Sequence, residues 1–278
     1  MGRTSIRACF QSLYEWKPQD WCWCMQCRLT AQRHAEGTEA MSLPAYLIAL
    51  NLSTLPVDYH WDNEVFNTFW AANDEDSPRL AEALSLISVR AAYGLGVACS
   101  EWVAARMTGH VDTADALLRI EAAWAASVDR CYANLPEPPP SPPSAPKHFV
   151  SPLRLSMILL STAVELYQGP GEGVRSNTQG LAMLVEHIAG RHPAFAAWLT
   201  ESFRRAHQHF PSSDVAVEQE PAVPKAFYES GFVWRDGIAQ ESWDRFLETL
   251  DPSRNPYLRS PDKMRAAGFP GTPYGRTP

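Results

Sequence analysis

The stretch SPRLAEALSLISVRAAYGLGVACSEW, residues 77–102, decides the fold of this chain. Ser77 followed by Pro78 is a helix start, because serine caps a helix N-terminus and proline fits the first helical position. From there apolar residues recur at helical spacing, at Leu80, Leu84, Ile87, Ala91, Ala98 and Trp102. Other apolar residues lie on the opposite side, at Leu86, Val89, Tyr93 and Val97. A helix that is apolar nearly all round belongs inside a bundle, so the pattern predicts one long, central, buried helix.

Helical spacing continues through most of the remaining chain. The predicted helices run from about Asp112 to Leu135, Ser151 to Gly169, Asn177 to Gly190, Pro193 to Pro211, Trp243 to Leu250 and Ser260 to Gly268. The sequence therefore predicts an all-α protein: a multi-helix bundle of two helical layers behind a mostly irregular N-terminal extension.

Composition divides the chain into four predicted parts. Residues 1–40 are an extension, 41–135 an acidic helical half, 136–150 a proline-rich linker, and 151–278 a second helical half with a C-terminal wrapping tail. The linker contains PEPPPSPPSAPK, which favours extended polyproline geometry. A semi-rigid spacer is favoured there over a ligand for an SH3-like partner.

The two halves invite comparison as an internal duplication at an offset of 74 residues. The offset superposes Ser77-Pro78 on Ser151-Pro152, Tyr93 on Tyr167, Ala122-Ala123-Trp124 on Ala196-Ala197-Trp198, and Arg130 on Arg204. Most other positions differ. Convergence is the alternative, because Ser-Pro opens many helices and alanine-rich helices align by chance.

Cysteines crowd the N-terminal extension around WCWCMQC, residues 21–27. Cys9, Cys22, Cys24, Cys27 and His34 are soft ligands that tetrahedral zinc would accept. A zinc knuckle usually pairs two such halves, and the sequence has no second one. The favoured interpretation is an upstream extension without function, with Met41 as the natural start. A structural arm and a metal site stay open.

Several functional classes are disfavoured by composition. The net charge of −7 argues against general nucleic-acid binding, which needs clustered lysine and arginine. No uninterrupted apolar run reaches the roughly 18 residues of a membrane span, and no apolar leader is visible. The sequence has no P-loop, dinucleotide-binding, HExxH or GxSxG motif. We therefore expect a cytoplasmic protein without cofactor, and lean away from an enzyme.

Two groups of residues keep an enzyme open as the alternative: a helical hydrolase or metalloenzyme. One group is the histidines His187, His192, His207 and His209. The other is the ionisable residues in apolar helices, Arg90, Glu101 and Glu165. Buried acids often mark active sites, but ion pairing and placement at helix ends explain such residues more simply.

Negative charge is concentrated in one half. Residues 41–135 hold 12 acids against 5 bases, whereas residues 136–278 hold 15 against 14. The candidate partner-binding residues are Asp58, Asp62, Glu64, Asp74, Glu75, Asp76, Asp112 and Asp115. Such asymmetry can steer a basic partner, although a merely solvated acidic face is the simpler explanation.

As a class, acidic, mid-sized, all-helical proteins of bacterial appearance without catalytic signatures resemble immunity proteins, which neutralise a cognate toxin. This resemblance assigns no residues. The leading hypothesis is an inhibitor or immunity factor that covers a basic, toxin-like partner with its acidic half. A non-catalytic scaffold is a further alternative.

Overall fold

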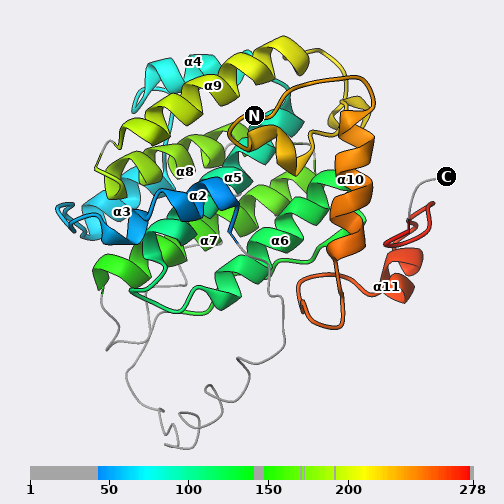
Figure 1. Cartoon of the computed structure of the whole chain (residues 1–278), viewed down its shortest axis with the longest axis horizontal. Coiled ribbons are helices and arrows are strands. Elements are labelled where there is room, and N and C mark those ends of the chain that lie inside the picture. Colours follow the sequence, from blue (N-terminus) through cyan, green and yellow to red (C-terminus); the bar gives the residue numbers. More distant parts are fainter. Residues whose placement is uncertain (1–42, 141–146, 170, 172, 191, 276–278) are drawn as a thin grey trace, which may run out of the picture. The chain divides into compact units, whose positions relative to one another are not determined.

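The computed structural model describes residues 43–140, 147–169, 171, 173–190 and 192–275 (Figure 1). The predictions for residues 1–40, including a metal site at Cys22, Cys24 and Cys27, lie outside the described residues. Within those ranges the chain forms helices and isolated β-bridges but no strand. The predicted all-α multi-helix bundle is confirmed.

The helices from α4 onward follow the predicted order along the chain, whereas α2 and α3 were not predicted. They are α2 (Ala45–Ala49), α3 (Asn63–Trp70), α4 (Pro78–Ser85), α5 (Val89–Met107), α6 (Ala114–Val128), α7 (Lys147–Gln168), α8 (Val174–Ile188), α9 (Pro193–His209), α10 (Ile238–Thr249) and α11 (Pro261–Ala266). Short 3₁₀ turns cover Leu52–Thr54, Arg130–Tyr132, Val217–Gln219 and Lys225–Tyr228.

Helix α5 is the centre of the bundle, and it packs against α6, α7 and α8 (Figure 1). All its residues from Ala91 to Met107 are buried. Its small residues allow neighbouring helices to approach closely. A Cβ atom on Gly94 would lie 2.8 Å from the ring of Tyr228, and one on Gly96 2.8 Å from Thr178 Oγ1. Helices from both sides of the proline-rich segment thus share one core.

The single helix predicted over residues 77–102 is wrong, because the structure breaks it into α4 and α5. The backbone leaves the helix at Leu86, and the Ser88 side chain caps α5 by accepting from Ala91 N at 3.1 Å. Ser88 N donates to Phe210 O, and Ser212 N donates to Leu86 O, both at 2.9 Å. These backbone hydrogen bonds to the residues that end and follow α9 thus stabilise the break between α4 and α5. Leu86 lies at the break and is 48% exposed.

Helix α7 also departs from its predicted start at Ser151. It begins at Lys147, so Pro152 lies inside the helix. Its part Phe149–Gln168 is long and apolar enough to cross a membrane by length and composition. This stretch was not identified from the sequence, because charged and polar residues interrupt it. The bundle buries 61% of that window, as is typical of a core helix.

The positions of the helix ends do not support the proposed duplication. Ser77 precedes the first residue of α4, whereas its counterpart Ser151 lies within α7. The counterparts Tyr93 and Tyr167 stack on each other, with ring centroids 4.2 Å apart. The duplication stays a prediction.

The segments flanking α6 and α7 are held by side chains of those helices. Arg119 of α6 donates to Pro136 O at 2.6 Å, and Arg154 of α7 donates to Pro139 O at 3.1 Å. After α10, the chain returns to α6. Asn255 Nδ2 donates to Leu118 O at 2.8 Å, and Asn134 N donates to Tyr257 O at 2.9 Å.

Candidate functional site: the acidic surface of α3

Helix α3 begins at the second of the predicted acidic residues. Asp62 is its N-cap, and its side chain accepts from Val65 N at 2.9 Å. His60 Nε2 lies 2.6 Å from the other carboxylate oxygen of Asp62. Glu64 follows in the first turn, where negative charge meets the positive end of the helix dipole.

One side of α3 is fixed firmly to the bundle. Phe69 is buried, and the backbone of α3 runs directly against α8 at Gly180. A Cβ atom on Gly180 would lie only 2.4 Å from Phe69 O. The opposite side of α3 leaves Asn63, Glu64, Asn67 and Thr68 exposed.

The turn after α3 carries three more of the predicted acids and is internally bonded. Asp76 accepts from Asn73 N, and Asn73 Oδ1 accepts from Glu75 N, both at 2.9 Å. Gln179 of α8, only 1% exposed, donates to Asn73 O at 2.6 Å. In the described part of the chain, the carboxylates of Asp74 and Glu75 make no hydrogen bond or ion pair. The turn therefore holds two unpaired carboxylates on a rigid support.

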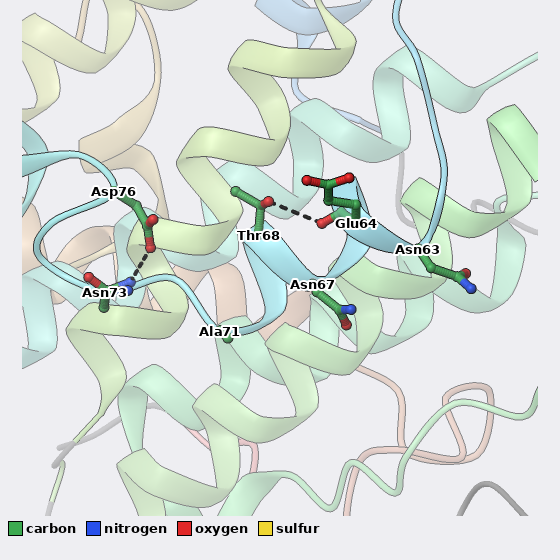
Figure 2. Close-up of a pocket in the computed structure, with 7 residues that line it drawn as sticks. All are labelled: Asn63, Glu64, Asn67, Thr68, Ala71, Asn73 and Asp76. Carbon is green, nitrogen blue, oxygen red and sulfur yellow. Dashed lines mark hydrogen bonds between the residues drawn. The ribbon is translucent and has the colours of Figure 1, made fainter.

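Helix α3 and this turn line a hollow of about 500 Å³ that is open to solvent (Figure 2). Its lining consists of Asn63, Glu64, Asn67, Thr68, Ala71, Asn73 and Asp76. Figure 2 shows Glu64 and Asp76 toward opposite ends, with Thr68 of α3 and its C-cap residue Ala71 between them. A second hollow of about 470 Å³ meets the first at Asn63 and is lined also by Trp61, Asp62, Phe66, Pro140, Ser151 and Arg154.

The structure brings only five of the eight predicted partner-binding residues to α3, its cap and its turn: Asp62, Glu64, Asp74, Glu75 and Asp76. Asp112 accepts from Ala114 N at 2.9 Å, just before α6. Asp115 of α6 bonds Arg119 Nε at 2.8 Å and also the Tyr257 hydroxyl. Asp58 is exposed before α3 and lies close enough to Arg106 to raise the pKa of that guanidinium, against the larger lowering by burial.

The sequence interpretation missed the amides of the hollow. Asn63 and Asn67 are one helical turn apart on the exposed face of α3, and this spacing was a usable signal. Nothing local pointed to Gln179, which reaches the turn across 106 residues of sequence.

Three arginines lie in the interior, in contrast to the eight predicted acids. Arg106 Nε donates to Ile188 O at 3.1 Å, Arg119 Nη1 to Pro136 O at 2.6 Å, and Arg205 Nη1 to Glu229 O at 3.3 Å. All three arginines are buried, whereas all eight predicted acids are exposed. Arg119 pairs with Asp115, and Arg106 lies near Asp58, so in the described part of the chain neither arginine pairs with the five acids of α3, its cap and its turn.

The ionisable residues of the enzyme alternative have separate structural partners. Glu101 is 2% exposed, and its Oε1 atom accepts from Trp124 Nε1 at 3.0 Å and lies 3.1 Å from Lys225 Nζ. Arg90 Nε donates to Val217 O at 2.9 Å. Glu165 lies on the exposed side of α7.

The histidines do not gather at one place. His187 Nε2 bonds His60 O at 2.7 Å, and His192 Nδ1 accepts from Ala194 N at 3.2 Å at the start of α9. His207 and His209 lie in the last turn of α9, about 25 Å along the helix from His192. His209 stacks on Trp234 at 4.7 Å, and burial lowers its pKa. Among the described residues, no three His, Cys, Asp or Glu side chains are grouped to hold a metal ion.

The Asp62 cap predicts a pH dependence of stability. The N–H of Val65 and then His60 hold the pKa of Asp62 below its usual value. This contribution is therefore present above the pKa of the unfolded chain, about 3.9, and is lost as the pH falls through the folded pKa. Asp62→Asn should lose less stability than the wild type between pH 7 and pH 3, measured as urea midpoints. Asp74→Asn, which removes an unbonded carboxylate, should behave as the wild type, and equal losses in all three proteins would contradict this role of the cap.

No family model matches the chain, and neither a curated protein nor a solved structure matches it.

Proposed function

We propose that this chain is a protein-binding protein that contacts a basic partner through the acidic surface of α3. We define that surface by the residues Asp62, Glu64, Asp74, Glu75 and Asp76. Negative charge on a surface attracts basic proteins and speeds their diffusional encounter.

The observation that carries the proposal is the rigid turn of residues 73–76. Buried Gln179 anchors it through Asn73 O, while Asp74 and Glu75 keep their carboxylates unpaired in the described chain. A surface that is already ordered loses little conformational entropy on binding. Arg106 and Arg119 lie in the interior beside Asp58 and Asp115, and in the described residues neither of them pairs with an acid of the α3 surface.

Within this class, we propose an inhibitor or immunity factor that neutralises a basic, toxin-like partner. Support for this finer assignment is the class-level resemblance of acidic all-helical proteins to immunity proteins. The coarser proposal, a basic protein partner, does not depend on it.

The first experiment identifies the partner. The purified chain is immobilised and exposed to lysate of its native host at low salt, and bound protein is eluted with a salt gradient. We expect a single stoichiometric, basic protein, which is then purified for binding measurements. If the affinity of that protein for the chain were the same at low and at high salt, binding through charge would be contradicted.

Charge reversal tests the surface itself. Asp74→Lys with Glu75→Lys should slow association with the purified partner about tenfold or more at low salt, because encounter is steered by charge. These side chains have no bonding partner in the described structure, so the free energy of unfolding should change by about 0.5 kcal/mol or less.

The matched control is Glu165→Lys with Asp214→Lys, which makes the same charge change on α7 and in the loop after α9. If both double variants slow association equally, the effect comes from net charge and not from the α3 surface.

A further inference from the structure

Buried polar side-chain atoms without a hydrogen-bond partner gather in one part of the bundle. The described residues contain seven such atoms, and four of these belong to Tyr46 of α2, Trp102 of α5, and Ser202 and Arg205 of α9. A polar group that is buried without a partner lowers stability, so nearly all such groups are bonded in folded proteins. Four unpartnered atoms in one region therefore point to an occupant.

Ring contacts connect the three helices at this place. The ring centroids of Tyr46 and Trp102 lie 6.3 Å apart, and those of Trp102 and Trp198 lie 5.5 Å apart. Ser202 lies one turn beyond Trp198 on the buried side of α9, and Arg205 follows on the same side. The four residues thus belong to one interior region between α2, α5 and α9.

The indole N–H of Trp102 lies near the Tyr46 hydroxyl without bonding to it. Trp102 is 1% exposed, and within the described part of the chain neither its Nε1 atom nor Tyr46 Oη has a hydrogen-bond partner. Burial raises the pKa of Tyr46 most, and the nearby Trp102 indole lowers it. The two groups are therefore neighbours, and a small molecule between them could bond to both.

The atoms of α9 show the same pattern. Arg205 Nε lies 3.7 Å from Glu201 Oε1, which is too far for a hydrogen bond. Ser202 is 1% exposed, and its hydroxyl bonds to none of the described residues. Burial lowers the pKa of Arg205, and Glu201, Tyr228 and Tyr46 counteract this, which places Tyr46 near the guanidinium.

The hydrogen-bonding capacity of these atoms restricts the occupant. Trp102 Nε1 and Arg205 Nε can only donate, so the occupant must accept hydrogen bonds. The hydroxyls of Tyr46 and Ser202 can donate or accept. A molecule that both accepts and donates is therefore able to satisfy all four atoms.

The charges around the region restrict the occupant further. Glu101 and Glu229 are close enough to raise the pKa of Tyr46. Lys225 Nζ lies 3.1 Å from Glu101, and Arg205 Nη1 donates to the backbone oxygen of Glu229 at 3.3 Å. Two acids are thus matched by two bases, so a neutral molecule fits the described surroundings better than an ion.

We propose that ordered water occupies the interior between α2, α5 and α9, with one molecule bridging Trp102 Nε1 and Tyr46 Oη. This water accepts from the indole N–H and donates to the hydroxyl oxygen, and a second water bonds Ser202 Oγ and Arg205 Nε. Buried waters typically make about three hydrogen bonds to such groups. Helix α2 is then joined to α5 through water, and this inference does not depend on the proposed function.

NMR of the full chain detects such a water directly. The assigned indole N–H of Trp102 should show a nuclear Overhauser effect to water, with the opposite signs in the laboratory and rotating frames that mark a long-lived bound molecule. The indole N–H of Trp198 is the internal control, because it donates to Tyr228 O at 2.7 Å. It should show no such signal.

Tyr46→Phe tests the bridge. The water signal at Trp102 should persist in this variant, because water still accepts from the indole and no hydroxyl proton remains at position 46 to relay exchange. The equilibrium constant for folding should fall about fivefold, since the water loses one partner. Tyr93→Phe calibrates this loss, because the Tyr93 hydroxyl donates directly to Ala123 O at 2.8 Å.

A dry interior predicts the opposite results. Removal of an unpaired hydroxyl would then raise the equilibrium constant for folding of Tyr46→Phe, and the indole of Trp102 would show no signal to water. Either result would overturn the proposal. A water signal that disappeared in Tyr46→Phe would also overturn it, because the signal would then come from the tyrosine hydroxyl.

Discussion

Gly180→Ala should lower the free energy of unfolding by about 3 kcal/mol, at the upper end of overpacking effects. The added methyl carbon would lie 2.4 Å from Phe69 O and 3.4 Å from Phe69 C. Both are backbone atoms, so no side-chain rotation relieves the contact, and α3 must move away from α8. Because Gln179 is adjacent to Gly180, the variant should also disturb the turn of residues 73–76. Urea denaturation measures the first effect, and amide chemical shifts of residues 63–76 measure the second.

Gly169→Ala is the matched control for this substitution. The nearest atom to its added carbon would be Leu166 O at 3.5 Å, an ordinary contact. We expect a change in unfolding free energy of about 0.5 kcal/mol or less there. Equal stability of the Gly180 and Gly169 variants would contradict the close packing of α3 on α8.

Lys225→Met should also cost about 3 kcal/mol of unfolding free energy. Glu101 is buried on α5, and Lys225 Nζ lies 3.1 Å from its carboxylate. Removal of the lysine charge leaves a carboxylate in a dry interior, and breaking a buried ion pair from one side typically costs about 3–5 kcal/mol. The lower value applies because the Lys225 side chain retains 17% exposure.

The partner substitution separates charge from packing. Glu101→Gln keeps an acceptor for Trp124 Nε1 but removes the charge. Adding Glu101→Gln to Lys225→Met should therefore restore part of the lost stability, a coupling of about 1–3 kcal/mol. Lys263→Met, on the exposed side of α11, should have almost no effect. Additive losses in the double variant would mean that Lys225 stabilises the fold by packing alone.

The sequence was sufficient to predict a buried central helix, but it was not sufficient to predict where that helix begins. The apolar residues from Ala91 to Trp102 allow no exposed face, and every one of them is buried. The break at Leu86 depends on backbone pairing with Phe210 and Ser212, more than 120 residues away. The Ser88 cap was a local signal of the second start, but Leu86 and Ile87 continue the apolar spacing without interruption and concealed the break.

The candidate site, like the helix boundary, depends on contacts between residues that are distant in the sequence. Asp62 and Asp115 were named as acidic candidates from the sequence, but neither helix α3 nor the Asp62 cap was predicted. Nor did the sequence show that Asp115 bonds Tyr257, or that buried Gln179 anchors Asn73. These contacts decide which carboxylates are occupied and which are available. The concentration of candidates on α3 and its turn was therefore visible only after folding.

The central claim is that Asp74 and Glu75 belong to the surface that a basic partner meets. The most direct measurement is the association rate constant of the purified partner, taken against ionic strength for the wild type and for Asp74→Lys with Glu75→Lys. We predict a rate for the wild type that falls steeply with added salt, and a slower rate with a much flatter dependence for the variant. Coincident curves for the two proteins would contradict the claim.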